Sequence, residues 1–153
     1  MTFNKDEVKQ ITDHVNNYRK EHNSKVVKHS AKISKISQAH SDNIVSTGQF
    51  KHSNNSYGEN LYMSKSAKMI NPNEKINYVL KAIDAWYNEY TFYNFEKNDF
   101  EPRSGHFSQL VWNNCSEFGI GVSIKENKIY VCMNFNPAGN VRNQFKENVK
   151  DKM

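Results

Sequence analysis

Histidine and acidic side chains supply the groups from which a metal or acid–base site could be built. The sequence has 6 His and 16 Asp and Glu residues. Imidazole nitrogen and carboxylate oxygen both suit zinc in a tetrahedral shell that leaves a position for water. His52 and Glu59 are close in the sequence, across a loop that contains Gly58, whereas His106 is distant. Spacing alone therefore groups these residues only as a weak cluster.

The motifs that usually accompany hydrolytic chemistry are absent from the sequence. There is no His-Glu-x-x-His helix and no Gly-x-Ser-x-Gly turn, and neither Cys115 nor Cys132 stands in a motif that lowers the pKa of a thiol. Ser53 or Ser108 could enter a Ser-His-Glu arrangement, but we interpret both as polar residues of longer motifs. Two cysteines are too few for the disulfide framework of a small secreted domain, so we expect free thiols.

Apolar residues at intervals of three and four predict the helices that must position these side chains. The first helix is expected from Lys5 to His22, and the second begins after a capping Ser30 and ends at Gly48. The clearest pattern predicts a third helix over 76–90. Helical spacing in 106–112 predicts a short fourth helix.

Strict alternation of apolar residues predicts a β-hairpin over 118–124 and 129–135, with a turn near Glu126, and a short strand is expected at 60–63. Helices that flank a small antiparallel sheet define an α+β domain, which we expect to be a three-layer α-β-α sandwich. One domain spans 1–153, and residues 146–153 are expected to form a frayed tail.

Composition limits the classes of partner and compartment. The chain is 37% hydrophobic and 12% aromatic, which excludes disorder as its main state. Its formal charge of +5 favours acidic partners, but no Arg run or zinc-finger spacing supports nucleic-acid binding. No stretch is apolar enough for a membrane span, and the first residues lack the centre of a signal peptide. The sequence as written therefore predicts an intracellular or peripheral membrane protein, or an extracellular one if a leader was removed.

Four ordered motifs resemble the CAP superfamily of cysteine-rich secretory proteins, insect antigen 5 and plant pathogenesis-related proteins. They are His52-Ser53 with Tyr57-Gly58-Glu59-Asn60-Leu61, then Ala85-Trp86-Tyr87-Asn88-Glu89, then Gly105-His106-Phe107-Ser108-Gln109-Leu110-Val111-Trp112, and finally Asn136-Pro137-Ala138-Gly139-Asn140-Val141. Asn16, Tyr18 and Arg19 agree with the opening helix of the family. The chain is most similar to the Golgi-associated branch, which has no cysteine-rich extension.

One position departs from the family pattern. The family often has Cys where this chain has Met133, and Cys132 lies one residue earlier. A shift of one residue in a strand reverses the face to which the side chain points. The usual disulfide of secreted members is therefore not expected here.

The resemblance implies that His52, Glu59, Glu89 and His106 converge on a cleft. It makes His52 and His106 the ligands of a zinc ion, with the carboxylates orienting them or a water. The remaining histidines are expected to be ordinary surface or helix-face residues: His14, His22, His29 and His40. Glu89 also has a simpler interpretation, as the solvated side of the third helix.

The family resemblance favours a non-catalytic binding module for sterols, fatty acids or acidic lipid headgroups. Two alternatives stay open: a metal-assisted hydrolase with Glu59 or Glu89 as general base, and a protein-interaction or immune-related secreted module. A homodimer is also compatible with the sequence.

A basic surface is predicted around the start of the second helix. Its lysines follow one another at spacings of three and four: Lys25, Lys28, Lys32 and Lys35. Such spacing places several ammonium groups on one side, where they could meet an anionic membrane. The alternative is an ordinary solvated face.

Overall fold

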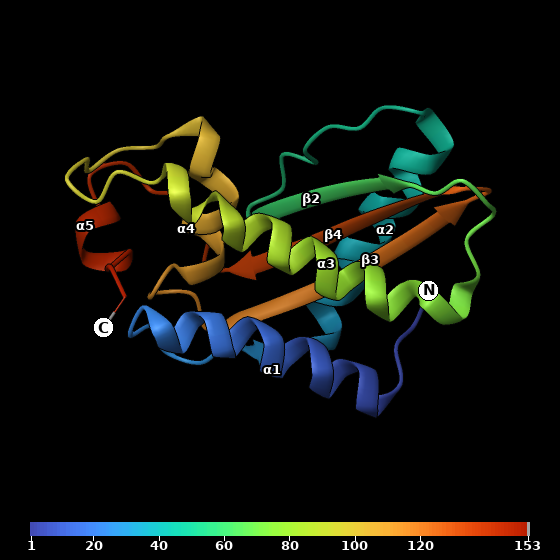
Figure 1. Cartoon of the computed structure of the whole chain (residues 1–153), viewed down its shortest axis with the longest axis horizontal. Coiled ribbons are helices and arrows are strands. Elements are labelled where there is room, and N and C mark those ends of the chain that lie inside the picture. Colours follow the sequence, from blue (N-terminus) through green and yellow to red (C-terminus); the bar gives the residue numbers. More distant parts are fainter. Residues whose placement is uncertain (153) are drawn as a thin grey trace.

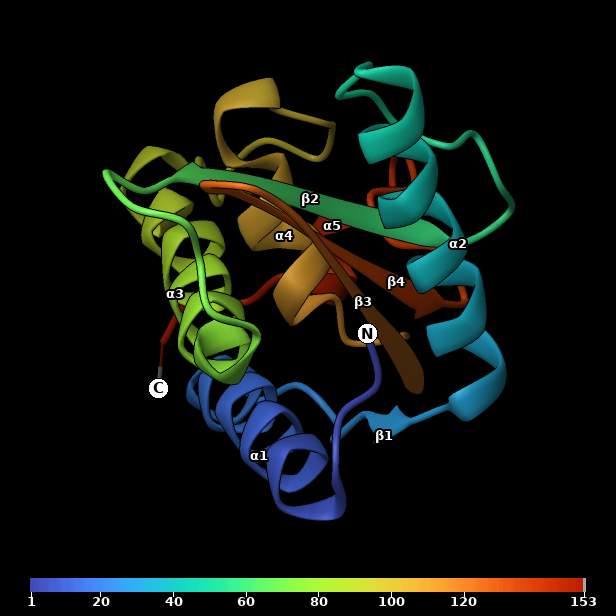
Figure 2. The same cartoon turned by 90° about the vertical axis from the view of Figure 1, so that its right-hand side faces the viewer.

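A four-stranded sheet lies between two layers of helices in the computed structural model, which describes residues 1–152 (Figure 1). α2 (Ala31–Thr47) covers one face of the sheet, and α1 (Lys5–Glu21) with α3 (Lys75–Asn88) covers the other, as Figure 2 shows. The strand order is β1-β3-β4-β2, for β1 (Lys28–His29), β2 (Gly58–Lys65), β3 (Glu117–Lys125) and β4 (Lys128–Asn136). The expected three-layer α+β sandwich is confirmed.

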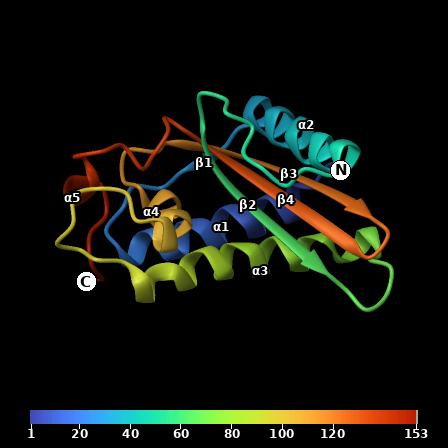
Figure 3. The ribbon, with the colours of Figure 1, turned by 90° about the horizontal axis from the view of Figure 1, so that it is seen from above.

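Short helical elements complete the chain. They are the 3₁₀ turns η1 (Pro72–Glu74), η2 (Glu89–Phe92) and η3 (Pro102–Ser104), and the helices α4 (Gly105–Val111) and α5 (Phe145–Asn148). The loop between α2 and β2 returns along the sheet, so β2 begins beside α4 (Figure 3). This return brings two motifs that are distant in the sequence to one end of the sheet.

The sheet is mixed rather than wholly antiparallel, which corrects the sequence-based expectation. β2 and β3 each pair with β4 in antiparallel register, and the predicted hairpin is present. β1, in contrast, runs parallel to β3 and pairs only Lys28 with Glu117 and His29 with Phe118. A two-residue strand carries no alternation that could reveal it in the sequence.

The glycines of β3 let α2 lie directly on the strand. A Cβ atom at Gly119 would lie 2.3 Å from the backbone carbonyl carbon of Ile33, and one at Gly121 would lie 2.4 Å from the backbone nitrogen of Gln38. Phe118, which pairs with His29 of β1 and directly precedes Gly119, belongs instead to the main core with residues of α1 and α3. The Phe-Gly-Ile-Gly-Val order therefore gives β3 two different faces. Its large apolar side chains enter the core, and its glycines face the backbone of α2.

The helix ends follow their capping residues. Asn4 forms a capping box with Glu7 at the start of α1, and the Ser30 hydroxyl accepts from the backbone N–H of Ile33 at 3.2 Å in α2. Gly48 closes α2 at φ 70°, a left-handed conformation that favours glycine. These ends were predictable because they depend on local hydrogen bonds.

The carboxyl-terminal segment is packed, so the expectation of a frayed tail is wrong through residue 151. Phe145 is fully buried and Val149 is 3% exposed. The carbonyl of Lys150 lies 2.7 Å from Nδ1 of His22, and the Tyr90 hydroxyl donates to Asp151 at 2.7 Å. The segment lacks a long apolar repeat, and contacts with distant segments order it, including hydrogen bonds from the backbone N–H groups of Asn113 and Asn114 to Asn148.

Candidate functional site

The first half of the site is Glu59 on β2 and the histidine of the preceding loop. One Glu59 carboxylate oxygen lies 2.9 Å from Nδ1 of His52 and accepts the backbone N–H of Ser53 at 2.9 Å. The other oxygen accepts from the Ser53 hydroxyl at 2.5 Å and from the Asn134 amide at 3.1 Å. An ionised carboxylate only accepts hydrogen bonds, so Nδ1 of His52 carries a proton, and in the neutral imidazole Nε2 keeps its lone pair.

Hydrogen bonding determines the charge of this pair. Burial acts to raise the pKa of Glu59, but hydrogen bonds from His52, Ser53 and Asn134 outweigh it and lower the pKa to about 2. The same hydrogen bond to Glu59 raises the pKa of His52. Glu59 is therefore a carboxylate at neutral pH that holds the imidazole in one orientation.

The second half of the site is Glu89 of η2 and His106 of α4. The Glu89 carboxylate lies 2.7 Å from Nδ1 of His106 and accepts the backbone N–H groups of His106 at 2.9 Å and Phe107 at 3.3 Å. Ser104, the residue before α4, offers no side-chain cap. Glu89 therefore caps the helix from a distant segment and orients His106 at the same time, rather than lying on a solvated helix side.

Both halves meet in one small cavity. Its volume is about 160 Å³, and it is lined by His52, Glu59, Asn60, Phe100, Pro102, Gly105, His106 and Asn140. Glu89 lies behind His106 and outside this lining. Among the residues that the structure describes, none hydrogen-bonds to Nε2 of either His52 or His106.

The free donors that face the cleft are the Nε2 atoms of two imidazoles. Residues 1–152 contain no group of three or more His, Cys, Asp or Glu side chains that could hold a metal ion together. A divalent ion in the cleft would take Nε2 of His52 and His106, while Glu59 and Glu89 would stay behind the rings as their hydrogen-bond acceptors.

His40 belongs to the surroundings of the site, although sequence analysis placed it outside. Its side chain is 7% exposed, and its Nε2 lies 2.7 Å from the carbonyl of Lys51 and 3.9 Å from the Glu59 carboxylate. It thereby holds the loop residue directly before His52. The signal was present in the sequence, because His40 shares the buried face of α2 with Ile33 and Ile44 and a buried imidazole needs a partner.

The other histidines have structural partners. His22, at the end of α1, is 1% exposed and lies between the Lys150 carbonyl and the Tyr87 hydroxyl, so of the two expected positions, surface or helix face, the surface is excluded. His14 pairs with Asp84 at 2.6 Å. None of these contacts involves the cleft.

Neither candidate serine forms a nucleophilic arrangement with the site histidines. The Ser53 hydroxyl donates to Glu59, and the buried Ser108 hydroxyl donates to Oδ1 of Asn140 at 2.5 Å, with the Gly105 carbonyl 3.2 Å away. A serine nucleophile needs its hydroxyl on a histidine nitrogen. Both serines instead fix the backbone of their motifs.

The two cysteines are buried free thiols, as predicted. Cys115 belongs to the main core, whereas Cys132 packs with Ile44 and Leu61 in a separate cluster beneath α2. Burial raises the pKa of Cys115 to about 11 and that of Cys132 well above its ordinary value. Both thiols are therefore protonated and unreactive at neutral pH.

A three-layer sandwich with two histidine–carboxylate pairs at one end of its sheet defines a distinct class of domain. The model of the cysteine-rich secretory protein (CAP) family matches residues 12–135. The chain belongs to this family.

Relatives and solved structures agree with this assignment. The chain is 32% identical over 141 residues to human Golgi-associated plant pathogenesis-related protein 1, covering 88% of this chain and 86% of that protein. It is 32% identical over 139 residues to protein PRY2 of Saccharomyces cerevisiae, covering 84% of this chain but only 39% of PRY2. The structure of NaASP2 with Zn2+ matches with a TM-score of 0.76 at 20% identity, over 98% of this chain and 87% of that one.

Proposed function

We propose that the protein is a non-catalytic binding module that attaches peripherally to anionic lipid, with a cleft that accepts a divalent metal ion. The observation that carries the proposal is an uncompensated basic surface around the start of α2. The name of the human relative, which places that protein at the Golgi, supports a membrane-associated role. Among residues 1–152, no helix combines the length and apolar character needed to cross a membrane.

The basic surface consists of Lys25, Lys28, Lys32 and Lys35, all of which are exposed. Within residues 1–152, no carboxylate lies within 4.0 Å of their ammonium groups, whereas Lys9 pairs with Asp13 at 2.6 Å. Each lysine near an acidic leaflet contributes roughly 1 kcal/mol. Four lysines then give about 4 kcal/mol, which corresponds to roughly millimolar attachment that salt would screen.

Changing three lysines of the basic surface to Glu should abolish sedimentation with phosphatidylserine vesicles at low salt. The variant is Lys28→Glu with Lys32→Glu and Lys35→Glu, and the parent should itself release from the vesicles at high salt. The matched control makes the same charge change in three exposed lysines at the hairpin end of the sheet: Lys65, Lys125 and Lys128. Equal loss in both triple variants, or binding that is indifferent to salt, contradicts the proposal.

The metal part of the proposal depends on the two free Nε2 atoms. Glu59 and Glu89 hold the Nδ1 side of His52 and His106, which is the arrangement that prepares an imidazole to bind a metal. The crystal structure of the neighbour NaASP2 was solved with Zn2+. A bound zinc ion would supply Lewis acidity in the cleft, and turnover of an ester only with zinc would favour the competing hydrolase function.

Replacing His52 and His106 together by Ala should abolish zinc binding measured by isothermal titration calorimetry. Each single variant should weaken binding by at least about tenfold, because the protein supplies few other ligands. Glu59 raises the pKa of His52, so protons compete with zinc for this imidazole as the pH falls. The affinity for zinc should therefore decrease toward acid pH. His14→Ala, outside the cleft, is the control. Zinc affinity of the double variant equal to that of the parent would refute the assignment.

A further inference from the structure

The first half of the site lacks the helix that supports the second half. His106 lies in α4, where backbone hydrogen bonds fix its position, whereas His52 lies in the loop between α2 and β2, which has no regular structure. A carboxylate lies against Nδ1 of each ring, at 2.9 Å from His52 and 2.7 Å from His106. The orientation of His52 therefore depends on what holds Glu59 in place.

The Glu59 carboxylate has one close anchor outside that loop. Within residues 1–152, four hydrogen bonds of 3.1 Å or less reach the carboxylate, and three of them come from the preceding loop, which Glu59 itself holds. The fourth comes from the side-chain amide of Asn134 at 3.1 Å. The Cys132 thiol and Nε2 of His40 are both farther away, at 3.9 Å. Asn134 is therefore the main polar contact between this carboxylate and the body of the sheet.

The amide of Asn134 is held in one orientation. Asn134 is fully buried on the inner strand β4, directly opposite Glu59 of β2. Its nitrogen donates to the Glu59 carboxylate and, at 3.1 Å, to the carbonyl of Gly58, while its oxygen accepts from the Ser37 hydroxyl at 2.8 Å. A carbonyl and an ionised carboxylate can only accept, so the nitrogen must face them and the oxygen must face Ser37.

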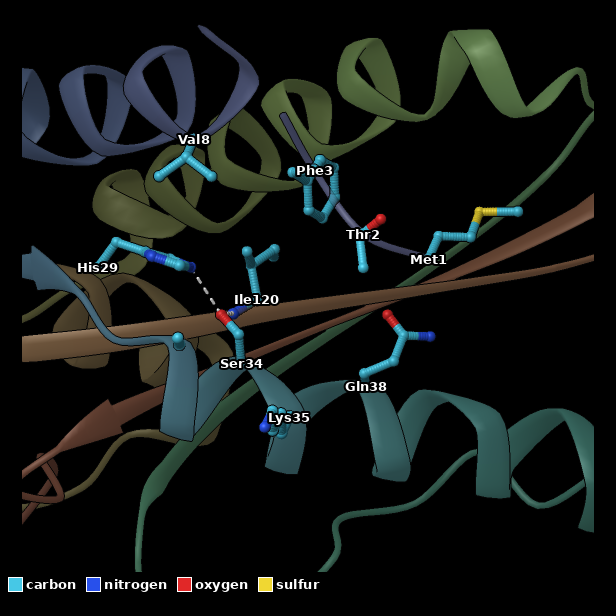
Figure 4. A pocket seen from close by; sticks show the side chains of 10 residues that line it. Met1, Thr2, Phe3, Val8, His29, Ser34, Lys35, Gln38 and Ile120 are labelled. Atoms are coloured by element: carbon cyan, nitrogen blue, oxygen red, sulfur yellow. Dashed lines mark hydrogen bonds between the residues drawn. The ribbon is translucent and has the colours of Figure 1, made fainter. Parts of the chain in front are cut away.

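Ser37 connects this amide to α2, and α2 is itself fastened to the sheet. The Ser34 hydroxyl of α2 accepts the backbone N–H of Ile120 at 3.0 Å. The Gln38 amide accepts from the backbone N–H of Val122 at 3.1 Å and donates to its carbonyl at 2.7 Å. Figure 4 shows the side chains of Ser34 and Gln38 rising from α2 toward β3. The hydrogen bond from Ser37 therefore starts from a helix that cannot shift freely on the sheet.

We propose that Asn134 is a positioning residue of the metal cleft. It carries the fixed position of α2 to Glu59, and Glu59 then sets the ring of His52. The inference rests on the metal part of the proposed function. Replacing the hydrogen-bond partner of a ligating imidazole typically costs roughly 10–100-fold in metal affinity. Asn134 acts one step behind that partner, so its loss should cost about tenfold, the lower end of this range.

The first test is zinc titration by calorimetry into the full chain carrying Asn134→Leu. Leucine has the branched shape of asparagine without its hydrogen-bonding groups, so Glu59 loses its anchor on β4. We expect zinc affinity to fall about tenfold. Asn148→Leu is the matched control, because Asn148 is 6% exposed and its amide bonds to Gln144 and Asn114, away from the cleft. It should leave zinc affinity unchanged.

A milder pair of variants decides the case in which Asn134→Leu does not fold. Ser37→Ala removes the hydroxyl that donates to Asn134. Ser41→Ala removes an equally buried hydroxyl of α2, which bonds to Ser123 at 2.8 Å instead. We expect Ser37→Ala to weaken zinc binding by at least about twofold, since a neutral hydrogen bond is lost, and Ser41→Ala to leave it unchanged.

Nitrogen NMR of the metal-free protein distinguishes positioning from a general loss of stability. At about pH 9, well above the ordinary pKa of imidazole, the proton of the neutral His52 ring should lie on Nδ1, facing Glu59. Asn134→Leu should convert this single tautomer into a mixture of both. His106 is the internal control, because Glu89 holds it without Asn134, and it should keep its proton on Nδ1 in both proteins.

The outcomes separate this inference from the proposed function. A His52 proton that stays on Nδ1 in Asn134→Leu, or zinc affinity that is unchanged in this variant, overturns the role of Asn134. Equal effects of Ser37→Ala and Ser41→Ala overturn it as well. A parent protein that does not bind zinc would refute the metal part of the proposed function. The tautomer of His52 would then still decide the role of Asn134, because it is measured without metal.

Discussion

Arg19→Met should lower the free energy of unfolding by roughly 3–5 kcal/mol, because each buried carbonyl left without a donor costs about 1–3 kcal/mol. Arg19 of α1 is fully buried, and its guanidinium donates only to backbone carbonyls. Four carbonyl oxygens accept from guanidinium nitrogens: those of Lys25 at 2.8 Å, Leu110 at 3.0 Å, Trp112 at 2.9 Å and Cys115 at 3.2 Å. Methionine fills a similar volume but leaves these carbonyls without a donor.

The position of Arg19 links stability to the site. Burial lowers the pKa of Arg19 to about 10, so it is still charged at neutral pH. Its charge lies at the carboxyl end of α4, where helix carbonyls favour a cation, and α4 carries His106 near its other end. We therefore expect Arg19→Met to weaken zinc binding as well as folding.

Urea denaturation monitored by circular dichroism measures the effect. Lys20→Met, at the exposed neighbouring residue of α1, is the matched control and should change the free energy of unfolding by less than about 0.5 kcal/mol. Arg19→Lys should also destabilise, because one ammonium cannot reach all the carbonyls that the planar guanidinium reaches. A loss below about 1 kcal/mol for Arg19→Met would contradict the assigned role.

Gly121→Ala should cost about 3 kcal/mol, toward the upper end for an overpacked site. The added Cβ would lie 2.4 Å from the backbone nitrogen of Gln38 and from the carbonyl carbon of Ser37. Both atoms belong to the backbone of α2, which cannot turn away as a flexible side chain can. The helix must therefore move off β3, which also disturbs the basic surface around the start of α2.

Gly48→Ala is the matched comparison. Gly48 has nothing within 4 Å of an added Cβ, and its φ of 70° alone penalises alanine, by about 1 kcal/mol. Comparing the melting temperatures of the two variants separates the steric clash at Gly121 from the backbone strain at Gly48. A melting temperature for Gly121→Ala equal to or above that for Gly48→Ala would show that α2 does not pack on β3 as closely as the structure has it.

The local elements of the fold could be predicted because their causes lie within a few residues. Ser30 and Gly48 mark the ends of α2, and alternation in 118–124 and 129–135 predicts the hairpin. β1 and the packed tail could not be predicted, because neither has a repeat of its own. Their order comes from pairing with Phe118 and from contacts with His22, both distant in the sequence.

The candidate site also has a part that the sequence predicts and a part that only tertiary contacts determine. Residue types and family motifs were enough to select His52, Glu59, Glu89 and His106, but not to show how they pair. The tertiary structure decided that each imidazole is held by a carboxylate through Nδ1, and it added His40 behind the first pair. The meeting of the two pairs in one cavity depends on the return of the α2–β2 loop to α4, and no spacing along the chain encodes that return.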